Sequence, residues 1–440
     1  MPIFALAILT GAGLTMGIAA RLPRNPLATT DQKEFEQKAL RILGSPAVQQ
    51  QRKIIENAFQ KDVWANTPEG KATFAAAINE LLFNSVIGAL NSDPGRPEVE
   101  WVWAPAHSWF GLDVPAAKFI MPNVDNVFRV IPVDDVSHYE IVAHPQGNRI
   151  PTQWTVQLIH SVPDIVGSQG VYSVLIDTDI IPRRDGSFTL TVGPEPGNGQ
   201  LNHLQTVPGA GLLLIRDTIA DWQNETPYRL EVRRVDGPAL SAAQDDSAVA
   251  NEAAELVKTT IPLVVKFKES AFQGPANAIP SPHVREGGRW GLATAGHFKL
   301  ADDEALILTL DPIGAKYLSV QLANRWLGSL DYIHHTASLN ITQAEANSDG
   351  SYTFVIAPRD PGSRNWVDTM QLHEGVVQIR WQKLPQPLEP SDSAVRSVKV
   401  VKLNALEDAL PRGTTKLSAV ERRKQLAVRE EGYARRFAEQ

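Results

Sequence analysis

The spacing of hydrophobic positions changes along the chain and predicts different elements in different regions. Between residues 31 and about 90 these positions recur three and four apart, which is the spacing of one face of an α-helix. Thr67 followed by Pro68 predicts a break and a new helix start inside this region. Residues 418–440 form a charged helical segment, in which Ser418 and Glu421 have the spacing of a capping box.

The middle of the chain has short segments of alternating polar and apolar residues, which predict β-strands. Gly-containing turns separate these segments, and examples are residues 139–142, 154–158, 171–175 and 188–192. An Ala-rich helical pattern follows over residues 241–272, and strands resume from residue 291 to 383. Short strands at this spacing are typical of a β-sandwich rather than of a parallel sheet with crossover helices.

Part of the strand-rich region is repeated in the sequence. The segment DGSFT at 185–189 corresponds to DGSYT at 349–353, a shift of 164 positions. The same shift relates 156–158 to 320–322, and the dipeptide Ile-Arg ending at Arg216 to the one ending at Arg380. Three separated segments in one register indicate a duplication. The Asp-Gly pairs themselves predict tight hairpin turns with a positive φ at glycine.

These patterns together predict a mainly β protein with helical additions. It is built from two tandem antiparallel β-sandwich units of jelly-roll type, with a helical N-terminal region and a C-terminal helix. The expected divisions are an apolar segment, a helical region, the first sandwich, a helical linker, the second sandwich and a helical tail, over residues 1–30, 31–103, 104–237, 238–289, 290–404 and 405–440.

Composition and charge narrow the class of protein. The chain has 440 residues, a net charge of −7 and no cysteine. An acidic chain without a basic patch is not expected to bind nucleic acid, and the lack of cysteine excludes disulfides and thiolate chemistry. Residues 1–20 carry no charged side chain. This segment is either a membrane anchor or export signal, or an apolar helix packed on the protein, which would then be cytoplasmic. The oligomeric state is left open.

Ordered motifs in the second unit resemble a known family. In chain order they are DDEAL at 302–306, SLN at 338–340 with Gln343, DG at 349–350, DPG at 360–362, NWVDT at 365–369 and RW at 380–381. In the first unit PNVDN at 122–126 and DW at 221–222 belong to the same pattern. This set resembles the domain-of-unknown-function 1214 family of bacterial proteins over roughly residues 121–383. The resemblance implies paired jelly-roll-like sandwiches and no particular activity.

The repeated arginines and one loop are the main candidates for chemistry. Arg216 and Arg380 stand among apolar neighbours on predicted strands, so each needs an acceptor, either inside the protein or on an anionic ligand. The loop over residues 360–369 combines two carboxylates with an amide and an aromatic ring. We expect it to line the principal cleft, with Asp360 or Asp368 ionised against Arg380. The alternative is an ordered loop whose polar side chains satisfy their own backbone.

The predicted site therefore lies on the second sandwich. Asp360, Asp368 and Arg380 are the candidate catalytic residues, and the candidate ligand-binding residues are Asn340, Gln343, Asn365, Trp366, His335 and Arg216. With a one-residue gap, the first unit aligns Leu201 with Trp366, His203 with Asp368 and Glu195 with Asp360.

No cofactor or metal is expected. The sequence lacks a Gly-x-Ser-x-Gly elbow, a phosphate-binding loop and a dinucleotide fingerprint. His334 and His335 are adjacent on a predicted strand and would point to opposite faces, so they cannot share a metal ion.

Two functions remain open, both with a small-molecule ligand. The first is an enzyme acting on a glycan, glycoside or lipid-like molecule. The second is a non-catalytic carbohydrate- or small-molecule-binding protein, in which an apolar pocket near Trp101, Trp103, Trp109 and Phe110 is another possible location.

Overall fold

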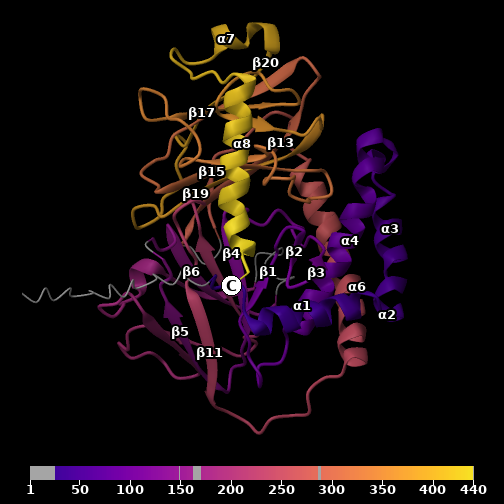
Figure 1. Ribbon diagram of the computed structural model, residues 1–440, viewed down its shortest axis with the longest axis vertical. Helices are drawn as coiled ribbons and strands as arrows, with labels where there is room; N and C mark the ends of the chain where they lie inside the picture. The colour runs from indigo at the N-terminus through magenta and orange to yellow at the C-terminus, as the bar shows by residue number, and fades with distance from the viewer. Residues whose placement is uncertain (1–24, 148, 162–169, 286–288, 440) are drawn as a thin grey trace, which may run out of the picture.

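The computed structural model describes residues 25–147, 149–161, 170–285 and 289–439. The apolar segment over residues 1–20 lies outside the described residues. Figure 1 shows three parts: a helical layer on one side, the first sandwich below, and the second sandwich above.

The helical layer is formed by the N-terminal region and the segment between the sandwiches. Its elements are α1 (Thr30–Leu43), α2 (Pro46–Gln50), α3 (Arg52–Phe59), η1 (Val63–Asn66), α4 (Pro68–Leu90) and α6 (Asp246–Ala271). As predicted, a new helix begins after Thr67, whose side chain accepts from Gly70 N while Pro68 occupies the first turn. Helix α4 is apolar and long enough to span a membrane by length and composition, but here it packs against α1 and α6.

Trp326 of the second unit joins this layer to the sandwiches. Its ring is fully buried and stacks on Phe59 with a centroid distance of 4.9 Å, while Trp64 and Phe74 meet it edge-on at 5.1 and 5.5 Å. Aromatic pairs in these geometries add to the stabilisation from burial alone. The helices are therefore part of one packed body with the sandwiches.

The first sandwich consists of a five-stranded and a four-stranded sheet. The five-stranded order is β1-β4-β10-β6-β7 and the four-stranded order is β11-β5-β8-β9. The strands are β1 (Glu100–Val102), β4 (Asn126–Pro132), β5 (His138–His144), β6 (Gln153–Ile159), β7 (Val171–Ile176), β8 (Phe188–Gly193), β9 (His203–Gln205), β10 (Leu212–Thr218) and β11 (Arg229–Asp236). A separate hairpin joins β2 (His107–Trp109) to β3 (Leu112–Val114).

The second sandwich repeats this order. Its sheets run β12-β13-β19-β15-β16 and β20-β14-β17-β18. The strands are β12 (His283–Val284), β13 (Gly291–Lys299), β14 (Glu304–Leu310), β15 (Tyr317–Ala323), β16 (Ser338–Asn340), β17 (Tyr352–Ala357), β18 (Trp366–Asp368), β19 (Glu374–Gln382) and β20 (Val395–Lys402). The predicted fold class is confirmed. Strands β1 and β12 complete the two large sheets, although they lie outside the residue ranges predicted for the sandwiches.

Pairing within the sheets preserves the 164-residue register. Ile215 pairs with Val156 in the first unit, and Ile379 pairs with Val320 in the second. Arg216 and Arg380 therefore lie on corresponding strands, β10 and β19, as the repeat predicts. Both Asp-Gly turns have the expected positive φ at glycine, +79° at Gly186 and +81° at Gly350.

The two units meet through their large sheets. Thr218 Oγ1 donates to Gln382 Oε1 at 3.3 Å, and these residues are counterparts in the repeat. Counterparts of two domain-sized units touch only where the axis relating the units passes close to them. The axis therefore runs between the ends of β10 and β19.

Two further contacts cross the interface in opposite directions. Asn340 Nδ2 of the second unit donates to Ala220 O of the first at 3.0 Å. Lys383 of the second unit forms an ion pair with Asp177 of the first. The repeat places the counterpart of Asn340 at position 176 and that of Ala220 at position 384. The ion pair between Lys383 and Asp177 is therefore the counterpart of the Asn340–Ala220 contact, displaced by one residue on each side. Contacts between the same patches in both directions indicate an approximate twofold arrangement.

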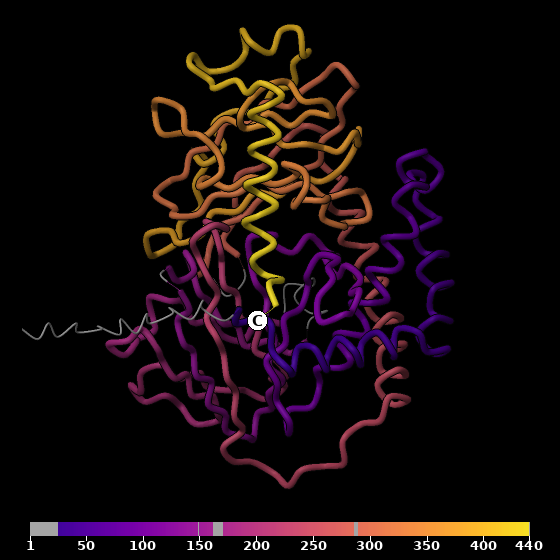
Figure 2. The backbone as a smooth tube through the Cα atoms, viewed as in Figure 1, coloured from indigo at the N-terminus to yellow at the C-terminus, as the bar shows by residue number. Residues whose placement is uncertain are grey.

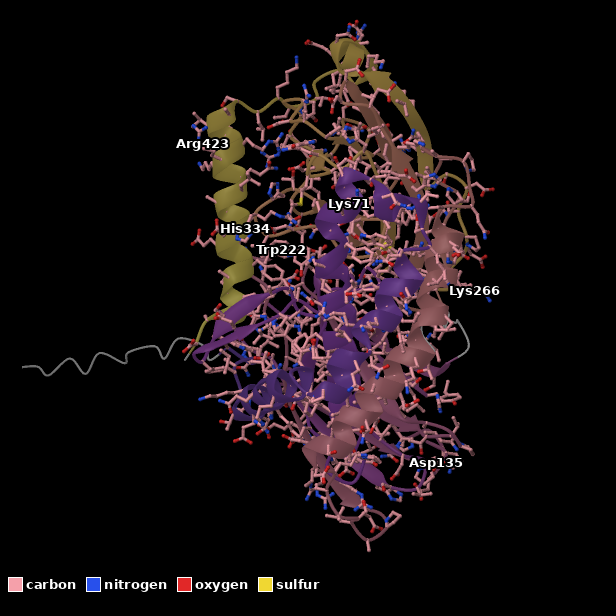
Figure 3. The ribbon with its side chains drawn as sticks, turned by 90° about the vertical axis from the view of Figure 1, so that its right-hand side faces the viewer. Lys71, Asp135, Trp222, Lys266, His334 and Arg423 are labelled. Carbon is pink, nitrogen blue, oxygen red and sulfur yellow. The ribbon has the colours of Figure 1, made fainter. Side chains whose placement is uncertain are left out.

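The C-terminal helix spans both units. Helix α8 (Ala419–Ala434) begins with the predicted capping box, in which Glu421 N donates to Ser418 Oγ and the Glu421 carboxylate accepts from Ser418 N. Its tube runs from the second unit to the chain end beside the first (Figure 2). At the first unit the guanidinium of Arg429 lies 4.3 Å from the Trp222 ring, and Figure 3 shows Trp222 beside the helix. The helix fastens the two sandwiches to one another.

Candidate functional site

A cavity of about 390 Å³ lies where the helical layer meets the large sheets of both units. Its walls come from α4, α6, β1, β4, β10, β13, β19 and the segment at 119–123. Most of the lining is apolar, and its larger members are Ile87, Val102, Trp103, Phe119, Phe128 and Val130. His283 and Ala295, on the neighbouring strands β12 and β13, are exposed lining residues, so the cavity approaches solvent on this side.

Both repeated arginines line this one cavity. Arg380 is 5% exposed on β19, and Nη1 donates to Gln321 Oε1 at 2.9 Å. Its Nη2 donates to Met121 O at 2.7 Å and also to Gln378 Oε1. These three acceptors are neutral. Burial lowers the pKa of Arg380 to about 10, and the nearby cation Arg285 acts in the same direction.

Arg216 on β10 occupies the corresponding position in the first unit. It is 6% exposed and Nη1 donates to Gln157 Oε1, which is the counterpart of Gln321. Its guanidinium lies over two aromatic rings, 5.6 Å from the centroid of Phe128 and 5.1 Å from that of Trp290. Cation–π contacts of this kind partly replace the hydration that a buried guanidinium loses. The Arg–Gln pair is thus present twice, but its further surroundings differ.

Asn123 places an amide beside Arg380. The Asn123 Oδ1 accepts from Asp125 N at 3.1 Å, which fixes the orientation of the amide, and it lies 2.9 Å from Tyr317 Oη. Asn123 lines the cavity, and its Nδ2 is buried and has no hydrogen-bond partner among the described residues. The same holds for Oδ1 of Asn126. Buried polar atoms without partners cost free energy.

Asp125 holds this corner of the cavity in place. Its carboxylate accepts from Tyr317 Oη of the second unit at 2.6 Å and from Trp222 Nε1 at 2.7 Å. Burial raises the pKa of Tyr317 well above its usual value, so its hydroxyl stays a donor. The PNVDN motif therefore has a structural function at Asp125 and presents Asn123 to the cavity.

The predicted loop does not line the cavity. Asp360 forms a bidentate ion pair with Arg422 of α8, at 2.9 and 3.0 Å, and accepts from Gly362 N. Asp368 accepts from Met370 N at 2.7 Å and pairs with Nδ1 of His335 at 2.8 Å. The expectation that either carboxylate faces Arg380 is wrong, because these nearer partners hold both.

The aromatic and amide members of the loop are also internal. Trp366 is 8% exposed, donates from Nε1 to Ala357 O at 3.0 Å, and lies under the guanidinium of Arg422. Asn365 bridges the backbone of Glu345 and Thr353. Trp366 is therefore packed inside the protein and does not line the cavity. The loop ties α8 and neighbouring strands together, which is the alternative that its turn chemistry left open.

The remaining candidates are dispersed. Asn340 donates across the unit interface to Ala220 O. Gln343 accepts from Arg429 Nη1 at 3.0 Å and so helps to hold α8. His335 meets only Asp368 among the predicted site residues. Of the predicted site residues, only Arg216 and Arg380 come together in the cavity.

The sheet register also corrects the alignment of the loop between units. Strand β9 pairs with β8 through Thr191 and His203, and β18 pairs with β17 through Val355 and Trp366. Because positions 191 and 355 are counterparts, His203 corresponds to Trp366. Gln205, not His203, then corresponds to Asp368.

The tryptophan cluster is divided between two environments. Trp103 lines the cavity and meets the Phe128 ring edge-on at 4.9 Å. Trp101 and Trp109 are buried elsewhere and pack on Phe437 near the chain end. The pocket suggested by this cluster therefore exists at Trp103. Asn123 was not predicted as a lining residue, although its motif was identified. The lining faces of α4 and α6 were not predicted either, because they resemble ordinary core.

Among the described residues, no group of three or more His, Asp or Glu side chains is placed to hold a metal ion.

Comparison with known proteins supports the fold. No protein-family model matches the chain, and no curated protein matches its sequence. The VPA0106 protein from Vibrio parahaemolyticus, at 13% identity over 64% of this chain and 90% of its own, has a TM-score of 0.37, which is too low to argue from. An uncharacterized protein from Burkholderia cenocepacia has a TM-score of 0.65 at 24% identity, over 83% of this chain and 99% of its own. This chain is therefore similar in fold to that Burkholderia protein.

Proposed function

We propose that this protein binds a small, mainly apolar molecule in the cavity between its two sandwiches and does not transform it. The cavity itself carries the proposal. Its volume of about 390 Å³ falls within the range of small-molecule sites, roughly 300 to 1,000 Å³, and apolar walls with a few polar groups are typical of such sites. Its walls come from both units and the helical layer, so only the complete fold forms it.

The polar groups of the lining favour binding over catalysis. Ser85 Oγ donates to Leu81 O at 3.0 Å and Thr294 Oγ1 to Pro280 O at 2.8 Å, so both hydroxyls already serve the backbone. No described residue of the lining is an aspartate or a glutamate. Glycoside hydrolysis needs a pair of carboxylates, and a sugar needs many hydrogen-bonding partners. A lipid-like ligand suits this lining better than a glycan.

A neutral fluorescent probe tests the proposal. N-phenylnaphthylamine brightens in apolar sites, and we expect saturable binding to the wild-type protein. Ala295→Trp places a large side chain at an exposed lining position and should weaken binding at least tenfold. Val235→Trp is the matched control, since Val235 is 49% exposed on β11 and does not line the cavity. Equal binding by all three proteins, or no saturable binding, would contradict the proposal.

A further inference from the structure

We infer that the ligand is an apolar monocarboxylate, a fatty-acid-like molecule whose carboxylate binds at Arg380 and Asn123. This inference rests on the proposed function and adds the chemistry of the head group. Three independent features of the lining support it.

The first feature is the charge of Arg380. Its side chain is buried, and its hydrogen-bond acceptors among the described residues are Gln321, Gln378 and a backbone carbonyl, all neutral. The carboxylate of Asp125 acts on it electrostatically but is itself held by Tyr317 and Trp222. A buried cation is costly unless an anion compensates it, and a ligand carboxylate would supply that charge.

The second feature is the supply of free donors. A guanidinium has five N–H groups. Three of those on Arg380 are used in the bonds to Gln321, Gln378 and Met121. The remaining two have no acceptor among the described residues, and Asn123, which lines the same cavity, carries a buried Nδ2 donor without a partner. Gln321 Oε1 accepts both from Arg380 and from Val124 N, at 3.4 Å, so Arg380 and the backbone next to Asn123 share one acceptor.

The third feature is the apolar remainder of the lining. Trp103, Phe119 and Phe128 offer large aromatic surface to a hydrocarbon chain. Each methylene buried against such walls should raise affinity about fourfold. A doubly charged head group would need more donors than this corner provides, so a carboxylate fits better than a phosphate.

The test compares head groups on one chain length. We expect wild-type protein to bind dodecanoate at least tenfold more tightly than methyl dodecanoate or dodecanol, and dodecyl phosphate more weakly than dodecanoate. Arg380→Gln should lower the dodecanoate affinity by about 10- to 100-fold, the loss expected for hydrogen bonds to a charged group, while dodecanol binding is retained. Asn123→Ala should lose severalfold, and Arg216→Gln should lose less than Arg380→Gln.

The outcomes separate the two proposals. If N-phenylnaphthylamine and dodecanol bind but dodecanoate shows no preference, the carboxylate inference fails and the proposed function stands. If none of these compounds binds the wild-type protein, both fail. An equal loss in Arg216→Gln and Arg380→Gln would overturn the assignment of the head group to Arg380. Retained dodecanol binding shows that each variant is folded.

Discussion

The two sandwiches share a framework but differ in the chemistry that fills it. In the first unit Asp217 on β10 forms a buried ion pair with Arg129 on β4. In the second, Trp381 on β19 replaces the aspartate and is fully buried, with Nε1 donating to Asp311 O at 2.8 Å. Thr294 on β13 pairs with Ile379 as Arg129 on β4 pairs with Ile215, so in the sheet register Thr294 occupies the position of Arg129. Equivalent backbone positions thus accept either an ion pair or a packed ring.

The cavity shows the same principle. Tyr317 of the second unit donates to Asp125 of the first, whereas Gln153, the counterpart of Tyr317, donates to Trp290 O at 3.1 Å. A symmetric framework thereby produces an asymmetric site, in which one repeated arginine lies over aromatic rings and the other beside a polar corner.

The largest effect is expected from breaking the ion pair that distinguishes the first unit. Asp217→Ala should lower the free energy of unfolding by about 3–5 kcal/mol, because it leaves the Arg129 cation buried without its partner. The double variant Arg129→Met/Asp217→Leu removes the unpaired charge and should recover part of this loss, because Tyr228 N and O, which the two side chains bind, stay without those partners. Chemical denaturation of the three proteins measures both. A double variant less stable than Asp217→Ala would show that uncharged side chains cannot replace the buried ion pair at these positions.

A smaller loss of stability is expected when the loop of the second unit is changed, and a still smaller one when its counterpart in the first unit is changed. Trp366→Ala removes a buried ring and should cost about 3 kcal/mol, whereas His203→Ala should cost less than about 1 kcal/mol because His203 is only partly buried. Thermal unfolding of both variants tests the difference. N-phenylnaphthylamine affinity should be unchanged in both. Loss of N-phenylnaphthylamine binding by a folded Trp366→Ala variant would instead indicate that the loop contributes to the ligand site.

The smallest effect concerns a contact that only the second unit makes with the helical layer. His373 lies between Glu69 of α4 and Asp302, and its counterpart in the first unit is Gly209. Hydrogen bonds to Glu69, and then to Asp302, raise the pKa of His373 above 6.5. A raised pKa means that the folded state binds the proton more tightly, so this stabilisation is present below about pH 6.5 and disappears as pH rises through the raised pKa.

His373→Gln should therefore lower the melting temperature near pH 6 and leave it unchanged well above the raised pKa. The difference should stay below about 1 kcal/mol, because the side chain is 45% exposed and water screens the pair. Melting temperatures of both proteins across this range provide the measurement. A difference that grows with pH would contradict the assignment of the proton to His373.

The sequence predicted the fold better than it predicted the site. Periodicity, the Asp-Gly turns and the repeat identified two sandwiches, because backbone geometry and burial leave local patterns. It also identified Arg216 and Arg380, since charged residues on apolar strands stand out. It wrongly placed Asp360 or Asp368 against Arg380, because the partners that hold them, Arg422 and His335, come from other segments.

The cavity itself could not be predicted. It is formed by faces of α4 and α6 whose apolar residues look like core, and by the approach of two sheets about the axis near Thr218. Asn123 belonged to an identified motif, but its unpartnered amide is visible only once Tyr317 and Asp125 are in place. Such tertiary relationships leave no trace in local spacing.

The most direct test of the central claim is a crystal structure of the full chain with dodecanoate. We predict electron density in the cavity between the sandwiches, with the carboxylate in hydrogen-bonding contact with Arg380 and Asn123 and the chain against Trp103, Phe119 and Phe128. Dodecanoate bound elsewhere while this cavity holds only water, or a chain in the cavity with its carboxylate turned away from Arg380, would contradict the account.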